Sequence, residues 1–254
     1  MITSRYQITD HDFSAFDKHE LSTSFKGVQY AKIQVKKDQY LHFFNTHLQE
    51  SHYTYTQEQY LRSVAIRQDQ LEHVVEFIKS KGPFPKGEVV MLAGNFNTDA
   101  LIGSDSKRGS TIADMLKDPV KFPLVAERKA DVLGQYQDLL EILADGGSFK
   151  VFDALFEKEK LHKPTYDVCR VRHGEWVPTE IFYTDAASEC SNQALDYIFH
   201  LDPQGVHSTV LDKKKKVTTK VDYTKSEQQK LKTYWYSPYR HLSTHYGVSA
   251  TVQF

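Results

Sequence analysis

The sequence has few cysteines, no long hydrophobic run and no excess of charge of either sign. Cys169 and Cys190 are its two cysteines, so neither a disulfide framework nor a structural zinc site is expected. No segment approaches the roughly 20 apolar residues that span a bilayer, and the first residues lack the apolar run of a signal peptide. The sequence as written predicts a soluble, cytoplasmic chain without a transmembrane segment. Secretion would require further residues before Met1.

The charge balance argues against stable nucleic-acid binding. Lys and Arg number 32 against 33 Asp and Glu, which gives a net charge of −1. Strong non-specific binding to duplex DNA needs a surplus of basic residues that displaces the counterions of the phosphates. A balanced chain would have to concentrate its basic residues locally.

The apolar content is high enough for a folded core. Hydrophobic residues make up 40% of the 254 positions, with 15 Tyr and 15 Phe. This amount of apolar surface can offset the entropy of ordering the chain. We expect one domain over residues 1–254.

The first half of the sequence has clear periodicities. Residues 25–50 alternate between apolar and polar side chains around a polar turn, which predicts a β-hairpin. From Thr56 to Lys79 apolar residues recur at helical spacing, and Gly82 and Pro83 follow. EVVMLAGNFN is a short apolar run typical of a strand that is buried on both faces.

The second half is less regular. Residues 100–119 resemble a loop, 131–145 a helix, and the stretch from residue 149 to Pro164 a further helix. Residues 192–203 form an apolar strand candidate, and alternation resumes after His245. Helices that fall between strands indicate layered sheets with helices outside.

Four polar clusters lie at the ends or flanks of the predicted strands. Each of these residues alone is more typical of a loop hydrogen-bonding residue than of a catalytic one. Strand ends, however, can deliver polar side chains into a common cleft. The clusters are Asn45 with His47, Asn95 with Asn97, Asp196, and Ser243 with Thr244 and His245.

The order and wording of these clusters resemble the endonuclease/exonuclease/phosphatase superfamily, and most closely its sphingomyelin phosphodiesterase branch. The motifs that carry the resemblance are ITSRYQI, NTHLQ, GNFNTD, LDYIF and STHYGV. The resemblance implies an α/β (α+β) fold of the deoxyribonuclease/sphingomyelinase type, a four-layer β-sandwich with flanking helices. It also implies that the family's first strands precede this chain, so that the first sheet is incomplete and the FKGVQYAKIQV hairpin keeps an open apolar face or edge.

The resemblance implies metal-assisted hydrolysis of a phosphodiester, with phospholipid as the substrate. His245 would take a proton from water, Asp196 would orient its imidazole, and His47 would donate to the phosphoryl oxygens. Asn97 would orient the nucleophile or the phosphate, and Asn95 stands beside it in the same motif. The cofactor would be Mg²⁺, a hard ion that prefers oxygen ligands.

The sequence departs from the family pattern at charged positions. Asn95 and Thr244 stand where the family has aspartate, and an amide cannot act as an anionic ligand or base. The family's metal-binding Asn and Glu precede the counterpart of ITSRYQI, so the metal ligands of this chain are unknown. A catalytically impaired member that binds lipid headgroups or a protein is therefore an alternative, and a superfamily nuclease is another.

A Lys-rich and aromatic stretch lies between Asp196 and His245, where bacterial sphingomyelinases carry a membrane-touching hairpin. Tyr234, Trp235 and Tyr236 suit a membrane interface, and Lys213 to Lys216 could meet anionic headgroups. The alternative is a solvated Lys turn with half-buried aromatic residues. The first interpretation places sphingomyelin in a membrane surface as the partner.

Overall fold

The computed structural model describes most of the chain, including every segment that forms the central sheet. The described residues are 1–20, 26–51, 56–85, 87–102, 115–159, 162, 164–167, 169–172, 175–178, 192–203, 217–222, 245 and 247–252. Statements below refer to these residues.

One mixed sheet of six strands organises the molecule, in the order β1-β2-β3-β4-β10-β5. Strands β3 and β4 are parallel, and every other neighbouring pair is antiparallel. Three two-stranded sheets pair β11 with β12, β6 with β9, and β7 with β8. The strands are β1 (Gln7–Ala15), β2 (Gly27–Lys36), β3 (Gln39–His47), β4 (Val89–Asn95), β5 (Phe149–Asp153), β6 (Tyr166–Asp167), β7 (Cys169–Arg172), β8 (Glu175–Pro178), β9 (Asn192–Gln193), β10 (Asp196–Pro203), β11 (Val217–Asp222) and β12 (Gly247–Val252).

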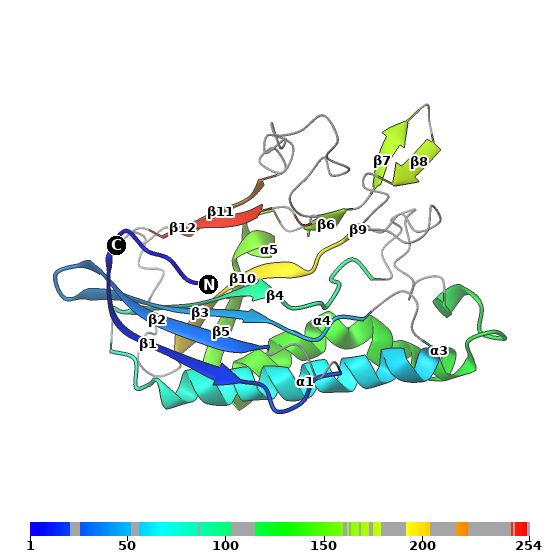
Figure 1. Cartoon of the computed structure of the whole chain (residues 1–254), viewed down its shortest axis with the longest axis horizontal. Coiled ribbons are helices and arrows are strands. Elements are labelled where there is room, and N and C mark those ends of the chain that lie inside the picture. Colours follow the sequence, from blue (N-terminus) through cyan, green and yellow to red (C-terminus); the bar gives the residue numbers. More distant parts are fainter. Residues whose placement is uncertain are drawn as a thin grey trace, which may run out of the picture.

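The helices α1 and α4 cover one face of the sheet, and β11 and β12 lie on the other (Figure 1). On the helical side, side chains of α1 such as Val74 and Ile78 pack against Phe44, Leu92 and Phe199 of the sheet. The helical elements are α1 (Gln57–Ser80), α3 (Pro123–Glu127), α4 (Lys129–Ala144), the short 3-10 helix η1 (Asp145–Gly147) and α5 (Ala154–Glu159).

The sequence of α1 explains both its start and the face it buries. The Thr56 hydroxyl accepts from the Gln59 N–H, and the Gln59 side chain accepts from the Thr56 N–H, which forms a capping box. The apolar residues at helical spacing are buried, as the periodicity over Thr56–Lys79 predicts. The helix prediction is confirmed.

The second face of the sheet carries its own apolar cluster. Met91, Ala93 and Ile198 are buried, and Val248 and Ala250 of β12 pack against the same cluster. The described layers are thus helix, sheet and strand pair. They confirm the predicted α/β fold of sheets with flanking helices, and the second sheet of the predicted four-layer sandwich is represented among the described residues by β11 and β12.

Two local predictions are corrected. The segment before Pro164 does not form one helix: β5 ends at Asp153, whose Oδ1 accepts the N–H groups of Leu155 and Phe156 and so caps α5. The hairpin also has no open edge, because β1 pairs with β2. At this edge of the sheet, exposed apolar side chains lie on or next to β1, at Tyr6, Ile8 and Phe13.

Candidate active site

The three central strands place one polar residue each at the same end of the sheet. His47 ends β3 and is paired with Asn95, which ends the parallel strand β4. Asn95 is in turn paired with Asp196, which begins the antiparallel strand β10. Since residues paired across neighbouring strands project from the same face of a sheet, the register forms a row of His47, Asn95 and Asp196.

His245 contacts this row through Asp196. Its Nδ1 lies 2.8 Å from Asp196 Oδ2, and both side chains are half-buried. A carboxylate oxygen can only accept a hydrogen bond, so the proton of the neutral imidazole belongs on Nδ1. The lone pair is then on Nε2, the arrangement that a general base needs.

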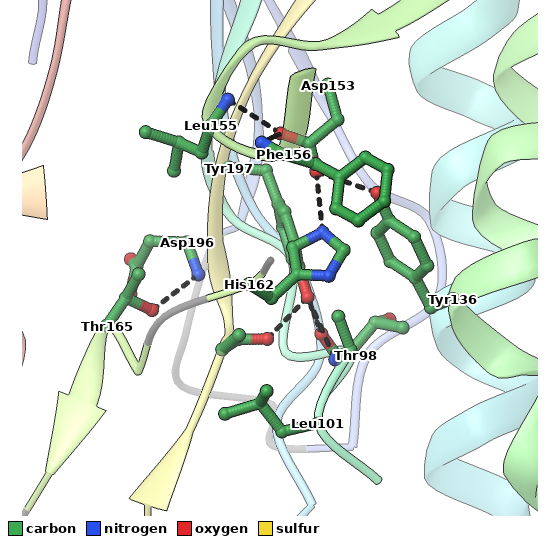
Figure 2. Close-up of polar contacts among 12 residues, drawn as sticks. Thr98, Leu101, Tyr136, Asp153, Leu155, Phe156, His162, Thr165, Asp196 and Tyr197 are labelled. Atoms are coloured by element: carbon green, nitrogen blue, oxygen red, sulfur yellow. Dashed lines mark hydrogen bonds and ion pairs between the residues drawn. The ribbon is translucent and has the colours of Figure 1, made fainter. Parts of the chain in front are cut away.

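The short strand β6 and the residue before it support both members of this pair. The Thr165 hydroxyl accepts the N–H groups of Leu195 and Asp196, each at 2.9 Å, and Thr165 is fully buried. Figure 2 shows Thr165 facing the backbone nitrogen of Asp196. Tyr166 forms an isolated backbone bridge with His245, and their ring centroids are 5.0 Å apart. Thr165 and Tyr166 are therefore positioning residues.

A second polar cluster surrounds Asp153, which ends β5 and is paired with Phe199 of β10. Its Oδ2 accepts from the Tyr136 hydroxyl at 2.7 Å and from His162 Nε2 at 3.0 Å (Figure 2). Tyr197 follows Asp196 and donates its buried hydroxyl to the Thr98 carbonyl at 2.7 Å. The Tyr197 bond holds β10 against the loop after β4, and the Asp153 bonds hold the end of β5 against α4 and His162.

The loop after β4 orients Asn95 and Asn97. The Asn97 backbone N–H donates to Asn95 Oδ1 at 2.8 Å, and Asn97 Nδ2 donates to the Leu48 carbonyl at 2.9 Å. Asn97 has φ of 50°, a left-handed conformation that asparagine tolerates better than most residues. Asn95 Nδ2 then faces His47 Nε2, at 3.5 Å.

The electrostatic surroundings of His47 include Lys26, which lies just before β2. Neighbouring groups partly desolvate His47, although its residue surface is exposed, and this desolvation lowers its pKa. The nearby Lys26 ammonium lowers the pKa further. Glu50 and Asp196 act in the opposite direction, whereas His245 adds a small lowering effect. The pKa of His47 therefore depends on charged groups from β2, from the chain after β3 and from the His245–Asp196 pair.

Comparisons with known proteins give the fold. No family model matches the chain, and no curated protein does. A structure of Staphylococcus aureus beta toxin with bound magnesium ions is 20% identical, covers 98% of this chain and 66% of its own, and has a TM-score of 0.58. Sphingomyelinase C from Streptomyces griseocarneus is 18% identical, with coverage of 97% and 65% and a TM-score of 0.52. The chain has the sphingomyelinase fold.

A structure of D. rerio TDP2 complexed with a single-strand DNA product is also similar, at 16% identity and a TM-score of 0.50. The matched region covers 98% of this chain and 69% of the TDP2 chain. This chain therefore spans about two thirds of the length of these structures with the sphingomyelinase fold.

The described side chains do not form a Mg²⁺ site of the kind that the resemblance implies. Among the described residues, no three His, Cys, Asp or Glu side chains are grouped as a metal site would need. Asn95 presents an N–H donor toward His47, and an ammonium group lies on the neighbouring carbonyl of Leu48. These groups are poor partners for a hard cation, which requires oxygen ligands.

The structure brings together five of the residues that the sequence singled out: His47, Asn95, Asn97, Asp196 and His245. Asn45 lies two residues earlier on β3, where its Nδ2 donates to the Ala93 carbonyl at 3.2 Å, so its role is in the sheet.

Other predicted residues lie outside the described part of the chain, namely Lys213 to Lys216, Tyr234, Trp235, Tyr236, Ser243 and Thr244. Within the described ranges, no helix is long and apolar enough to cross a bilayer.

Sequence reasoning missed Lys26, Thr165 and Tyr166. Thr165 and Tyr166 belong to the stretch HKPTYD, and nothing in its spacing indicates contact with Asp196 or His245. From the sequence, Lys26 is interpreted as a polar residue that flanks a strand. Only the tertiary structure shows that its side chain reaches the Leu48 carbonyl, at 3.0 Å.

Proposed function

We propose that this chain carries the catalytic residues of a phosphodiester hydrolase, and that its substrate is a phospholipid of the sphingomyelin type. The observation that carries the proposal is the bond of 2.8 Å between His245 and Asp196, at the end of the sheet where His47 and Asn95 lie side by side. If these residues only formed loop hydrogen bonds, there would be no reason for His47 and Asn95 to lie in one row with Asp196, the carboxylate that orients His245.

The geometry supports the following roles. His245 takes a proton from the attacking water through Nε2, while Asp196 holds the Nδ1 proton and stabilises the imidazolium that forms. His47 is exposed and can donate to a phosphoryl oxygen or to the leaving group. Asn97 holds Asn95 and the chain after β3 in place through its backbone and side-chain bonds.

The substrate assignment is supported by the motif resemblance and by the similarity to sphingomyelinase C. Tyr234, Trp235 and Tyr236, with Lys213 to Lys216, are proposed to touch the membrane that holds the lipid. A nuclease is the second candidate, because the similar TDP2 structure contains a DNA product. The net charge of −1 disfavours it.

The test compares substrates and two histidine variants. We expect phosphocholine release from sphingomyelin vesicles to exceed cleavage of single-stranded DNA in one preparation. His47→Ala should lower the rate by about 100-fold or more, since a positioned proton donor contributes about 10²–10⁴-fold. His11→Ala removes an exposed imidazole from β1 on the edge of the same sheet and should leave the rate unchanged.

Faster cleavage of DNA than of sphingomyelin would favour the nuclease. Normal turnover by His47→Ala would remove His47 from the mechanism. A preparation that hydrolyses neither substrate would contradict the proposed enzyme and favour the impaired member that only binds.

A further inference from the structure

The end of the sheet that holds His47 is rich in N–H donors. The Leu48 carbonyl accepts from Lys26 Nζ at 3.0 Å and from Asn97 Nδ2 at 2.9 Å. The Lys26 ammonium and the Asn97 side-chain amide therefore lie side by side, because both donate to the same carbonyl oxygen. An ammonium has three N–H donors, so the bond to Leu48 leaves capacity for a further acceptor.

The Asn95 amide adds a donor where the family pattern has a carboxylate. The Asn97 backbone N–H can only donate, so the Asn95 atom that faces it must be the oxygen. The NH₂ group consequently points the other way, toward His47 at 3.5 Å. An aspartate at this position would present a second acceptor oxygen and a negative charge in the same direction.

Charged groups of both signs surround this end of the sheet. Burial lowers the pKa of Lys26, while the nearby Glu50 carboxylate raises it. The Lys26 ammonium is bonded to the carbonyl of Leu48, the residue after His47, and its positive charge lowers the pKa of that imidazole. Asp196 is the carboxylate of the row, and its Oδ2 is bonded to His245.

We propose that Lys26, His47 and Asn95 form an anion subsite that binds the phosphoryl group of the substrate by direct N–H donation and does so in the absence of a divalent cation. Lys26 supplies the positive charge. The Asn95 amide supplies the N–H that is not directed at His47 Nε2, and the neutral His47 imidazole, whose Nε2 accepts from Asn95, supplies its Nδ1–H. The phosphoryl group is that of the proposed phosphodiester substrate, so this inference rests on the proposed function for the identity of its ligand.

The experiment measures binding instead of turnover. Inorganic phosphate is titrated into the chain in EDTA at constant ionic strength, followed by calorimetry and by the ring resonances of His47, and the titration is repeated with phosphocholine. We expect saturable binding of both, accompanied by a shift of the His47 resonances. Tighter binding of phosphocholine would indicate a lipid headgroup as the ligand, and equal affinities would indicate the phosphate group alone.

Variants distinguish binding at the proposed subsite from non-specific attraction of phosphate to positive charge. Lys26→Met should weaken phosphate binding about tenfold or more, because a charge-assisted hydrogen bond is lost. Lys26→Arg should restore most of the affinity. Lys37→Met removes the same charge from the exposed turn between β2 and β3 and should have no effect. Asn95→Asp should weaken binding in EDTA, since it replaces a donor with a negative acceptor.

Phosphate binding that appears only with Mg²⁺, or that is equal in Lys26→Met and the unmodified chain, would overturn the inference. If Lys26→Met does not fold, the titration of the unmodified chain in EDTA and the Asn95→Asp comparison decide it. Binding in EDTA without hydrolysis of sphingomyelin would uphold the subsite and count against the proposed function.

Discussion

At the scale of single residues, a buried carboxylate, Asp99, stabilises the backbone near the candidate site. Asp99 lies two residues beyond Asn97, and its Oδ1 accepts the N–H groups of Leu101 at 3.0 Å and Ala194 at 2.9 Å. It thereby connects the loop after β4 to Ala194, which lies between β9 and β10. Burial raises the pKa of Asp99 to about 6, against the lowering effect of these hydrogen bonds.

This raised pKa predicts a pH dependence of stability. Between the ordinary value of 3.8 and about 6, the folded protein keeps a proton on Asp99 that the unfolded chain has lost. The free energy of unfolding therefore falls as pH rises through this window, by an amount on the order of 3 kcal/mol from this group, and is constant above it. Asp99→Asn keeps the acceptor oxygen without the charge, and should lose this component of the pH dependence.

The measurement is urea unfolding of both proteins at pH 4 and pH 7. Asp131→Asn, which removes an exposed carboxylate that pairs with Arg128 on α4, is the control and should follow the unmodified chain. Equal pH dependence in Asp99→Asn and the unmodified chain would show that the buried carboxyl is not protonated in the folded state.

At the scale of elements, the close approach of β3 and β4 sets the spacing of the site. Gly94 pairs with Thr46, and a Cβ at Gly94 would lie 2.0 Å from the Thr46 carbonyl oxygen. Gly94 also has φ of 149°, a conformation that residues with side chains rarely adopt. The glycine therefore allows the next pair along, His47 and Asn95, to lie side by side.

Gly94→Ala should destabilise the fold by about 1–3 kcal/mol, because the strained backbone and the close contact cannot both be relieved. Gly134→Ala in α4 is the matched control. A Cβ there meets only the Asp138 carboxylate, at 3.8 Å, so the same change should stabilise the helix by about 0.5–1 kcal/mol. Chemical denaturation measures both, and a Gly94→Ala variant as stable as the unmodified chain would contradict the close approach.

Elements with strong local signals could be predicted from the sequence, and the others depend on tertiary contacts. The helix from Thr56 has both periodicity and a capping box, and β4 is a wholly apolar run. The stretch from residue 149 has mixed apolar spacing, and its strand forms because β10 offers a partner. The change to a helix at Asp153 then follows from the capping carboxylate.

Some residues of the candidate site can likewise be predicted from the sequence, and others depend on tertiary contacts. His47, Asn95 and Asp196 are found from the sequence because each lies at an end of an apolar strand. Lys26 and Thr165 act through bonds to backbone atoms more than 20 residues away, which no local pattern encodes.

At the scale of the whole molecule, the central sheet is stabilised by helices on one face and carries the candidate site at one end. The helices α1 and α4 stabilise its first face, and the row of His47, Asn95 and Asp196 lies at one end of the sheet with His245 bonded to it. The central claim is that His245 and Asp196 act as one catalytic unit. Residues that act as a unit have strongly non-additive effects on rate, whereas independent residues have effects that multiply.

The double-mutant cycle on sphingomyelin hydrolysis therefore tests the account most directly. We predict that His245→Ala and Asp196→Asn each lower the rate by about 10²–10⁴-fold. The double variant should be no slower than the slower single variant, because the orienting carboxylate has no role once the base is gone. Losses that multiply in the double variant, or single variants that keep the normal rate, would contradict the account.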